Sequence, residues 1–220
     1  MRIICGGNLQ RNDVLDESEI EIMDRKRLYQ TLMINVLGGG RQTDWLKKHR
    51  VFHRMGENCD FNMHLIPLYP RLISFGNNVN VASGVKFHTH DGVNNLLNKM
   101  TTYVPKRVES RRGTFQEGIG CIEIGDNVSI GSGAIISYGV HIGNNVIVSA
   151  GSIVIKDIPD NCVVRGVPAE VVCSFDAYVR IRASKKYFPP EIRHQMGRTI
   201  SKELEEYLWS DFKQKHLKQG

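Results

Sequence analysis

Residues 118–159 read GIGCIEIGDNVSIGSGAIISYGVHIGNNVIVSAGSIVIKDIP and carry an aliphatic anchor at every sixth position: Ile124, Ile130, Ile136, Ile142, Val148 and Val154. A small or branched residue follows four positions after each anchor, and Gly or Ser directly follows most anchors. An α-helix repeats every ~3.6 residues and a strand alternates every two, so neither explains a period of six. The repeat predicts a β-solenoid, a coil of very short strands that turns after each one.

The same period appears earlier in the chain, before a long interruption. Its anchors are Met55, Phe61, Phe75, Val81 and Phe87, and the partner positions expected inside with them are Cys59, Leu65, Val79 and Val85. The segment 67–70, PLYP, shifts the phase, and the rhythm stops at residue 91 and returns at Gly118. With three hexads in a coil, the two parts predict about four coils. Residues 91–117 then form a protruding loop, and loops of this length are often functional.

Helical patterns occupy both ends. Residues 1–52 predict an N-terminal helical arm with an apolar face at Leu28, Leu32 and Val36. Three glycines at 38–40 are expected to end its first helix, and Thr43 to cap a second helix over 44–50. This arm either packs against the solenoid or helps to shape an acceptor pocket.

Residues 174–220 predict a C-terminal helical extension, leaving 53–173 as the solenoid domain. Its last helix carries an apolar stripe at Ile200, Leu204, Leu208 and Phe212. We expect this stripe to cover a solenoid edge or a neighbouring subunit, because an open edge invites aggregation.

Composition favours a cytoplasmic protein with an anionic ligand. The net charge is +6 and the sequence pI about 9.1, and the basic residues form no nucleic-acid-binding motif, so a phosphorylated small molecule is preferred over nucleic acid. No long apolar run predicts membrane insertion, and the first 13 residues lack a secretory signal. The five cysteines form no CxxC pair, which indicates free thiols in a reducing compartment.

Two further stretches complete the pattern of one family. They are FGNNVNVASGVKFHTHDG at 75–92 and SAGSIVIKDIPDNCVVRGVPAEVV at 149–172. With the repeat, they resemble the hexapeptide-repeat acyltransferases, in particular the maltose, galactoside, xenobiotic and capsular-polysaccharide O-acetyltransferases. The resemblance implies a mainly β fold, a left-handed parallel β-helix flanked by N- and C-terminal α-helices. It also implies a homotrimer that binds acetyl-CoA between adjacent subunits and requires no metal.

The resemblance assigns the general base to His90, in FHTHDG. An unperturbed imidazole has a pKa of about 6.5, so it is largely neutral at pH 7 and can accept a proton from a hydroxyl. His88 is the competing base, and Asp91 is a candidate for orienting the ring. Asn80 and Ser83, on the preceding coil, are expected to face the acceptor together with His88.

The same resemblance places coenzyme A along the later coils. The implied contacts are Ser132, Ala150 and Gly151 for the pantetheine arm, and Lys156 and Arg165 for the phosphates. Alternatively, these are ordinary corner residues and surface charges. Three residues depart from the galactoside-type pattern, namely Ser129 in place of Trp, Ile155 in place of Thr, and Glu170 in place of a basic residue.

We therefore predict an acetyl-CoA-dependent O-acetyltransferase acting on a sugar or glycan precursor. One alternative is a xenobiotic (antibiotic) O-acetyltransferase, and another is a non-catalytic or metal-binding solenoid. A metalloenzyme such as a γ-type carbonic anhydrase needs three converging histidines. The chain offers His64, His88, His90 and His141 without the HxxxxH spacing of that family. The loop residues Lys106, Arg107, Arg111 and Arg112 either reach over the acceptor or are simply solvated.

Overall fold

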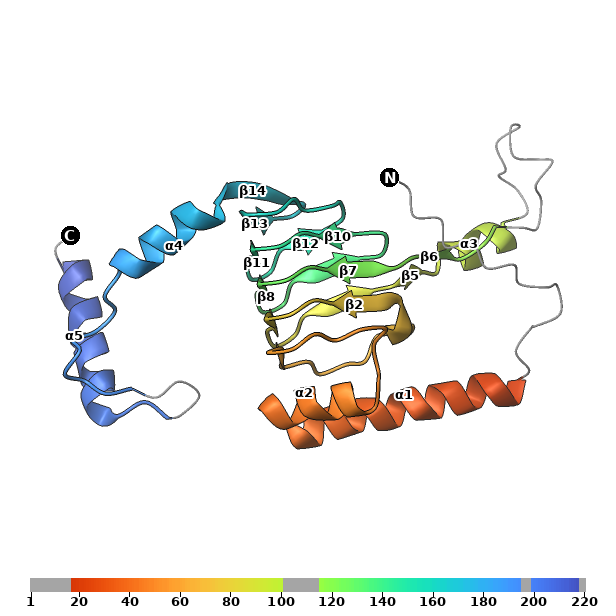
Figure 1. The fold of residues 1–220 in the computed structure, drawn as a ribbon, viewed down its shortest axis with the longest axis horizontal. Helices are drawn as coiled ribbons and strands as arrows, with labels where there is room; N and C mark the ends of the chain where they lie inside the picture. Colours follow the sequence, from red (N-terminus) through yellow and green to blue (C-terminus); the bar gives the residue numbers. More distant parts are fainter. Residues whose placement is uncertain (1–16, 101–114, 195–198, 218–220) are drawn as a thin grey trace. The chain divides into compact units, whose positions relative to one another are not determined.

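The computed structural model of the chain describes residues 17–100, 115–194 and 199–217 (Figure 1). The chain divides into two compact units, Met1–Phe175 and Asp176–Gly220. The first unit contains the six-residue repeat and is built from short strands that return, coil after coil, to the same three sheets. The four basic loop residues, Lys106, Arg107, Arg111 and Arg112, lie outside the described ranges.

The three sheets are parallel and in register. One contains β1 (Asp60–Phe61), β3 (Val79–Val81), β8 (Val128–Ile130), β11 (Val146–Val148), β13 (Cys162–Gly166) and, antiparallel to β13, β14 (Ala169–Ser174). The second sheet has the strand order β10 (His141–Ile142), β7 (Ile122–Ile124) and β2 (Ile73–Phe75). The third has the order β12 (Ile153–Val154), β9 (Ile135–Ser137) and β4 (Lys86–His88). The predicted parallel β-solenoid is confirmed.

The anchors of the repeat form the core of this unit. All six from Ile124 to Val154 are buried, as are Phe61, Phe75, Val81 and Phe87. The expectation for Leu65 is wrong, because its side chain is exposed while Met63 and Ile66 are buried instead. Met63 and Ile66 bond through their backbones to helical residues, so contact with the helices decides which side chains are buried here.

Asparagines build a ladder along one corner of the coils. Asn78, Asn127, Asn145 and Asn161 all have positive φ, between 54° and 59°. The side-chain amide of each of the first three donates to the next Oδ1 at 2.8 to 2.9 Å. The residue before each asparagine accepts a backbone N–H from the preceding coil, as Asp160 Oδ1 does from Asn144 at 2.7 Å. A Cβ on Gly143 would clash with Asp160 Oδ1, so only glycine fits at that position.

Asn127 provides a test of this ladder. Asn127→Ala removes two side-chain hydrogen bonds and leaves a non-glycine residue at positive φ, so we expect a loss of about 2 kcal/mol in the free energy of unfolding. Asn127→Gly removes the same bonds without the backbone strain and should cost about 1 kcal/mol less. Urea unfolding of both variants measures the difference. Equal losses would show that backbone strain makes no contribution at this corner.

Two helices cover the first coils. α1 (Glu17–Leu37) lies against α2 (Gly39–Lys48), which in turn packs on β1. The buried Gln42 donates from Nε2 to the carbonyls of Ile34 at 2.9 Å and Met63 at 2.8 Å, and its Oε1 accepts the Met63 N–H at 2.8 Å. Thr43 Oγ1 accepts the Phe61 N–H at 2.8 Å. One polar face of α2 therefore fixes the edge of β1 and the segment after it.

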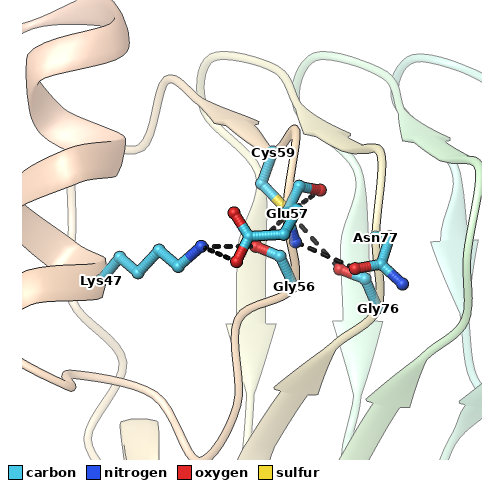
Figure 2. A network of polar contacts seen from close by, with 6 residues as sticks. All are labelled: Lys47, Gly56, Glu57, Cys59, Gly76 and Asn77. Carbon is cyan, nitrogen blue, oxygen red and sulfur yellow. Dashed lines mark hydrogen bonds and ion pairs between the residues drawn. The ribbon is translucent and has the colours of Figure 1, made fainter.

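Figure 2 shows how the end of α2 meets the first turn of the solenoid. Lys47 Nζ lies 2.5 Å from Glu57 Oε1, and the Glu57 N–H donates to Asn77 Oδ1 at 3.0 Å. Beside them the Cys59 thiol approaches the Gly76 carbonyl at 3.4 Å, and burial raises the pKa of that thiol. Because the Lys47–Glu57 pair is exposed, we expect it to stabilise the contact by only about 0–1 kcal/mol.

The glycine run ends the first helix as predicted, because α1 stops at Leu37 and Gly38 has a φ of 59°. The prediction for Thr43 is wrong, because α2 already starts at Gly39 and Thr43 lies within it, bonded to β1 instead of capping a helix start. The apolar face of α1 is also not covered: Leu28, Leu32 and Val36 are 71%, 60% and 70% exposed, whereas Ile34 is buried. The buried side of α1 is the one that contacts α2. The periodicity of the sequence does not indicate which side of the helix is buried.

The second unit contains most of α4 (Phe175–Ser184) and all of α5 (Lys202–Leu217). Of the predicted stripe on the last helix, Leu204 is buried, whereas Ile200, Leu208 and Phe212 are exposed. No described helix is both long and apolar enough to cross a membrane.

Candidate active site

Two short strands flank the interruption of the repeat and pair with each other. β5 (His90–Asp91) pairs antiparallel with β6 (Gly118–Ile119), so His90 faces Ile119 and Asp91 faces Gly118. α3 (Val93–Lys99) continues from the hairpin and protrudes beside the coils, as Figure 1 shows. The side chain of Phe87 in β4 is buried, that of His88 is exposed, and His90 lies half-buried where the chain departs.

Three segments meet at the His90 imidazole. Its Nε2 lies 4.0 Å from Glu117 Oε1, and both side chains are about one-third exposed, at 32% and 33%. Tyr69, just before the turn η1 (Pro70–Leu72), donates its hydroxyl to Glu117 Oε2 at 3.1 Å and packs edge-on to the His90 ring, with the ring centroids 5.4 Å apart. Burial, and next the bond to Glu117, raise the pKa of Tyr69, which keeps its hydroxyl a donor.

The two nitrogens of His90 have different surroundings. Nδ1 is buried and has no hydrogen-bond partner among the described residues. Nε2 lies beside the Glu117 carboxylate on a ring that is about one-third exposed. Nε2 is therefore the nitrogen that can exchange a proton with a bound molecule. The Glu117 carboxylate beside it can stabilise the imidazolium that results.

Asp91 does not orient the His90 ring. Its Oδ2 accepts the Tyr138 hydroxyl, and its Oδ1 accepts the Val93 N–H at 3.1 Å. The bond from Tyr138 is the first cause that lowers the pKa of Asp91, and the Val93 N–H is the second. Asp91 thus ties the start of α3 to β9 and the turn after it, while Glu117 is the carboxylate beside His90.

The pH dependence of this tie follows from the lowered pKa of Asp91. A carboxylate with a lowered folded-state pKa stabilises the fold above its ordinary pKa of about 3.9, and that contribution is lost as the pH falls through the folded value. Tyr138→Phe removes the main cause, so the pKa of Asp91 should rise toward its ordinary value. Carboxyl-carbon NMR titration measures it. Tyr187→Phe, in the second unit, is the matched control and should leave Asp91 unchanged; an unchanged Asp91 in Tyr138→Phe would refute the assignment.

The acceptor-side candidates lie on the coil that leads to His90. Asn80, in β3, is exposed, and His88, at the end of β4, lines a small apolar hollow of about 60 Å³ with Leu65, Pro67, Val85, Lys86 and Phe87. Ser83 is not free: its Oγ lies 2.7 Å from His64 Nε2.

The cofactor candidates fall into two groups. The first is a row of stacked turns, in which the Gly133 N–H donates to the Ser83 carbonyl at 3.0 Å and the Gly151 N–H to the Ser132 carbonyl at 2.9 Å. Gly151 has a φ of 70°, so its turn favours glycine. In the second group, Lys156 Nζ pairs with Glu170 Oε1 at 2.8 Å, and Arg165 lies opposite Glu170 in the β13–β14 ladder. Glu170 thus neutralises part of the charge of Lys156.

Several residues of this site were not predicted from sequence. Tyr69, Glu117 and Tyr138 lie far from His90 in the chain and belong to no motif. The one signal in the sequence that could have pointed to Glu117 is its place directly before Gly118, where the six-residue period resumes. Within the described ranges, no group of three or more His, Cys, Asp or Glu side chains is arranged to hold a metal ion.

Comparison with known proteins shows which family this chain belongs to. A family model described as the hexapeptide repeat of succinyl-transferase matches residues 122–156. The protein CapG of Staphylococcus aureus is 44% identical over 128 residues, which cover 57% of this chain and 67% of CapG. The chain belongs to the hexapeptide-repeat acetyltransferases. Members of this family use acetyl-CoA as the acyl donor, and their parallel β-helix is left-handed.

Two other members of the family are also similar to this chain. The galactoside O-acetyltransferase of Escherichia coli is 57% identical over 51 residues, 23% of this chain and 25% of that enzyme. A solved hexapeptide-repeat acetyltransferase of Vibrio cholerae has the same fold, with a TM-score of 0.51 and 21% identity over 71% of this chain and 93% of that one. The chain therefore spans two-thirds of CapG but only a quarter of the E. coli enzyme.

Proposed function

We propose that this protein is an acetyl-CoA-dependent O-acetyltransferase whose acceptor is a hydroxyl of a sugar or glycan precursor. Membership of the acetyltransferase family supports the reaction class. The observation that carries the residue assignment is at His90, where Nδ1 is buried and Nε2 lies 4.0 Å from a carboxylate. That arrangement suits a general base.

In the proposed mechanism, His90 Nε2 accepts the proton of the acceptor hydroxyl as the oxygen attacks the thioester carbonyl carbon. The C–S bond then breaks, and the departing thiolate of coenzyme A takes up a proton. Glu117 faces Nε2 and stabilises the imidazolium, and the Tyr69 hydroxyl holds the other carboxylate oxygen of Glu117. Both residues act as positioning residues for the base.

The remaining site residues keep their sequence-based assignments within this proposal. Asn80, Ser83 and His88 face the acceptor, and the turn row of Ser132, Ala150 and Gly151 faces the pantetheine arm. Lys156 and Arg165 contact the phosphates, and Lys156 does so in competition with Glu170. The solenoid of residues 53–173 is the catalytic domain of a cytoplasmic homotrimer, and the exposed apolar face of α1 is consistent with assembly.

Thiol release from acetyl-CoA tests the proposal. The purified protein is assayed with Ellman's reagent against a panel of mono- and oligosaccharides, with chloramphenicol included as a xenobiotic acceptor. We expect release that depends on a sugar. Release with chloramphenicol alone would make the protein a xenobiotic acetyltransferase, and failure to bind acetyl-CoA in calorimetry would refute the enzyme assignment.

A further inference from the structure

A second polar relay joins α1 to the first coils of the solenoid. Ser83 Oγ lies 2.7 Å from His64 Nε2, and His64 Nδ1 lies 3.1 Å from Asn35 Oδ1. Ser83 comes from the turn after β3, His64 from the segment after β1, and Asn35 from α1. A hydroxyl, an imidazole and a side-chain carbonyl in this order form the arrangement that activates serine nucleophiles.

The direction of each hydrogen bond in the relay follows from Asn35. Its Nδ2 donates to two backbone carbonyls, Thr31 O at 2.7 Å and His64 O at 2.9 Å. The amide orientation is therefore fixed, and Oδ1 must accept from His64 Nδ1–H. This tautomer leaves a lone pair on Nε2, so the Ser83 hydroxyl donates to it. An asparagine in this orientation supports the same tautomer as the aspartate of a triad and supplies less stabilisation to the imidazolium.

The helices are also fixed to the first coils by hydrogen bonds outside this relay. The buried Gln42 and Thr43 fix α2 to the first coils through three hydrogen bonds, and Gln42 Nε2 also donates to the Ile34 carbonyl of α1. Asn35 and His64 are exposed and Ser83 is half-buried, and hydrogen bonds at such positions add little to stability because water competes for the partners. The same partial exposure leaves the Ser83 hydroxyl accessible to a small reagent in solution.

The chain neighbours of the relay line a small apolar hollow. Leu65, next to His64 in the chain, and Val85, two residues after Ser83, line this hollow of about 60 Å³, which also contains His88. Ser83 also lies one coil before Ser132 in the stacked row of turns.

We propose that Ser83 is a second nucleophile, which takes a short acyl group from activated esters or thioesters. Ser83 Oγ attacks the carbonyl carbon while its proton passes to His64 Nε2. The bond from that carbon to sulfur or to the aryl oxygen breaks, and the leaving group takes the proton from His64. Water then releases the acid by the same route in reverse, which gives a slow esterase activity. This site operates without His90.

The experiment uses p-nitrophenyl acetate with no sugar present. Rapid quenching, intact-mass spectrometry and peptide mapping locate the acetyl group, and the release of p-nitrophenol gives the rate. We expect a gain of one acetyl group on the peptide that contains Ser83, both in the wild type and in His90→Ala. If the Ser83 peptide is still acetylated in His90→Ala, this site is independent of the proposed transferase. The two proposals can therefore be refuted separately.

Variants of the relay decide whether Ser83 is activated. His64→Gln should lower the rate of Ser83 acetylation by about 10²-fold or more, because a glutamine accepts no proton. Ser83→Ala should abolish the modification, while Ser129→Ala, on the neighbouring coil, serves as the matched control and should retain it. Circular dichroism confirms that each variant is folded. Acetyl groups found only on other residues, or a rate unaffected by His64→Gln, would overturn the proposal.

Discussion

His90→Ala should lower acetyl transfer from acetyl-CoA to the best sugar acceptor by about 10²- to 10⁴-fold. The variant removes the imidazole whose Nε2 lies beside Glu117, so no group remains to take the hydroxyl proton in the transition state. Because His90 lies half-buried on β5 and outside the solenoid core, the fold should be retained. Steady-state thiol release with the acceptor identified by the panel measures the effect.

Three further variants sharpen the His90 prediction. His141→Ala is the matched control, because His141 pairs with Glu123 elsewhere on the coils, and its rate should equal that of the wild type. His88→Ala tests the competing base and should cost far less than His90→Ala. Glu117→Gln removes the charge that stabilises the imidazolium and should give an intermediate loss in kcat. A larger loss in His88→Ala than in His90→Ala would move the base to His88.

Phe75→Ala should destabilise the solenoid severely, with a loss of about 3–5 kcal/mol in the free energy of unfolding. Phe75 is fully buried in β2, and its ring centroid lies 4.7 Å from that of Phe61, 5.1 Å from Phe52 and 5.5 Å from Phe87. Truncation leaves a cavity that the rigid coils cannot close. Urea unfolding, at one protein concentration for all variants, measures the loss.

Two comparisons separate the cavity from other effects of Phe75→Ala. Phe75→Leu keeps most of the apolar volume and should cost much less. Ile155→Ala shortens an aliphatic side chain that is 59% exposed, and should change stability by less than about 0.5 kcal/mol. If Phe75→Ala cost no more than Ile155→Ala, the aromatic cluster would not be the centre of the core.

The helices show where local patterns stop being sufficient. The sequence predicts helices at both ends, and the structure has them, but the apolar residues Leu28, Leu32 and Val36 are exposed. A helix has the same periodicity whichever of its sides is covered, and α2 selects the side of Ile34. The faces of α1 therefore follow from the partner helix, which periodicity does not specify.

The sequence by itself determined the solenoid. A period of six is a local signal that is repeated many times. Each repeat independently indicates that its anchor, from Ile124 through Val154, is buried, so the prediction becomes stronger with every repeat. The asparagines of the ladder carry a similar local signal, because Asn78, Asn127 and Asn145, all with positive φ, each follow a Gly and then an Asn or Asp. The assignment of His90 as the base comes from the family resemblance of the FHTHDG segment and stays a prediction.

Only the tertiary structure decided which residues surround the proposed catalytic side chains. Glu117 lies beside His90 although the two are far apart in the chain, and Tyr69 donates a hydrogen bond to Glu117 across 48 residues of chain. The relay of Asn35, His64 and Ser83 joins residues separated by 29 and 19 positions. A coiled chain brings such residues together only after every turn between them is formed, and no short stretch of sequence records that distance.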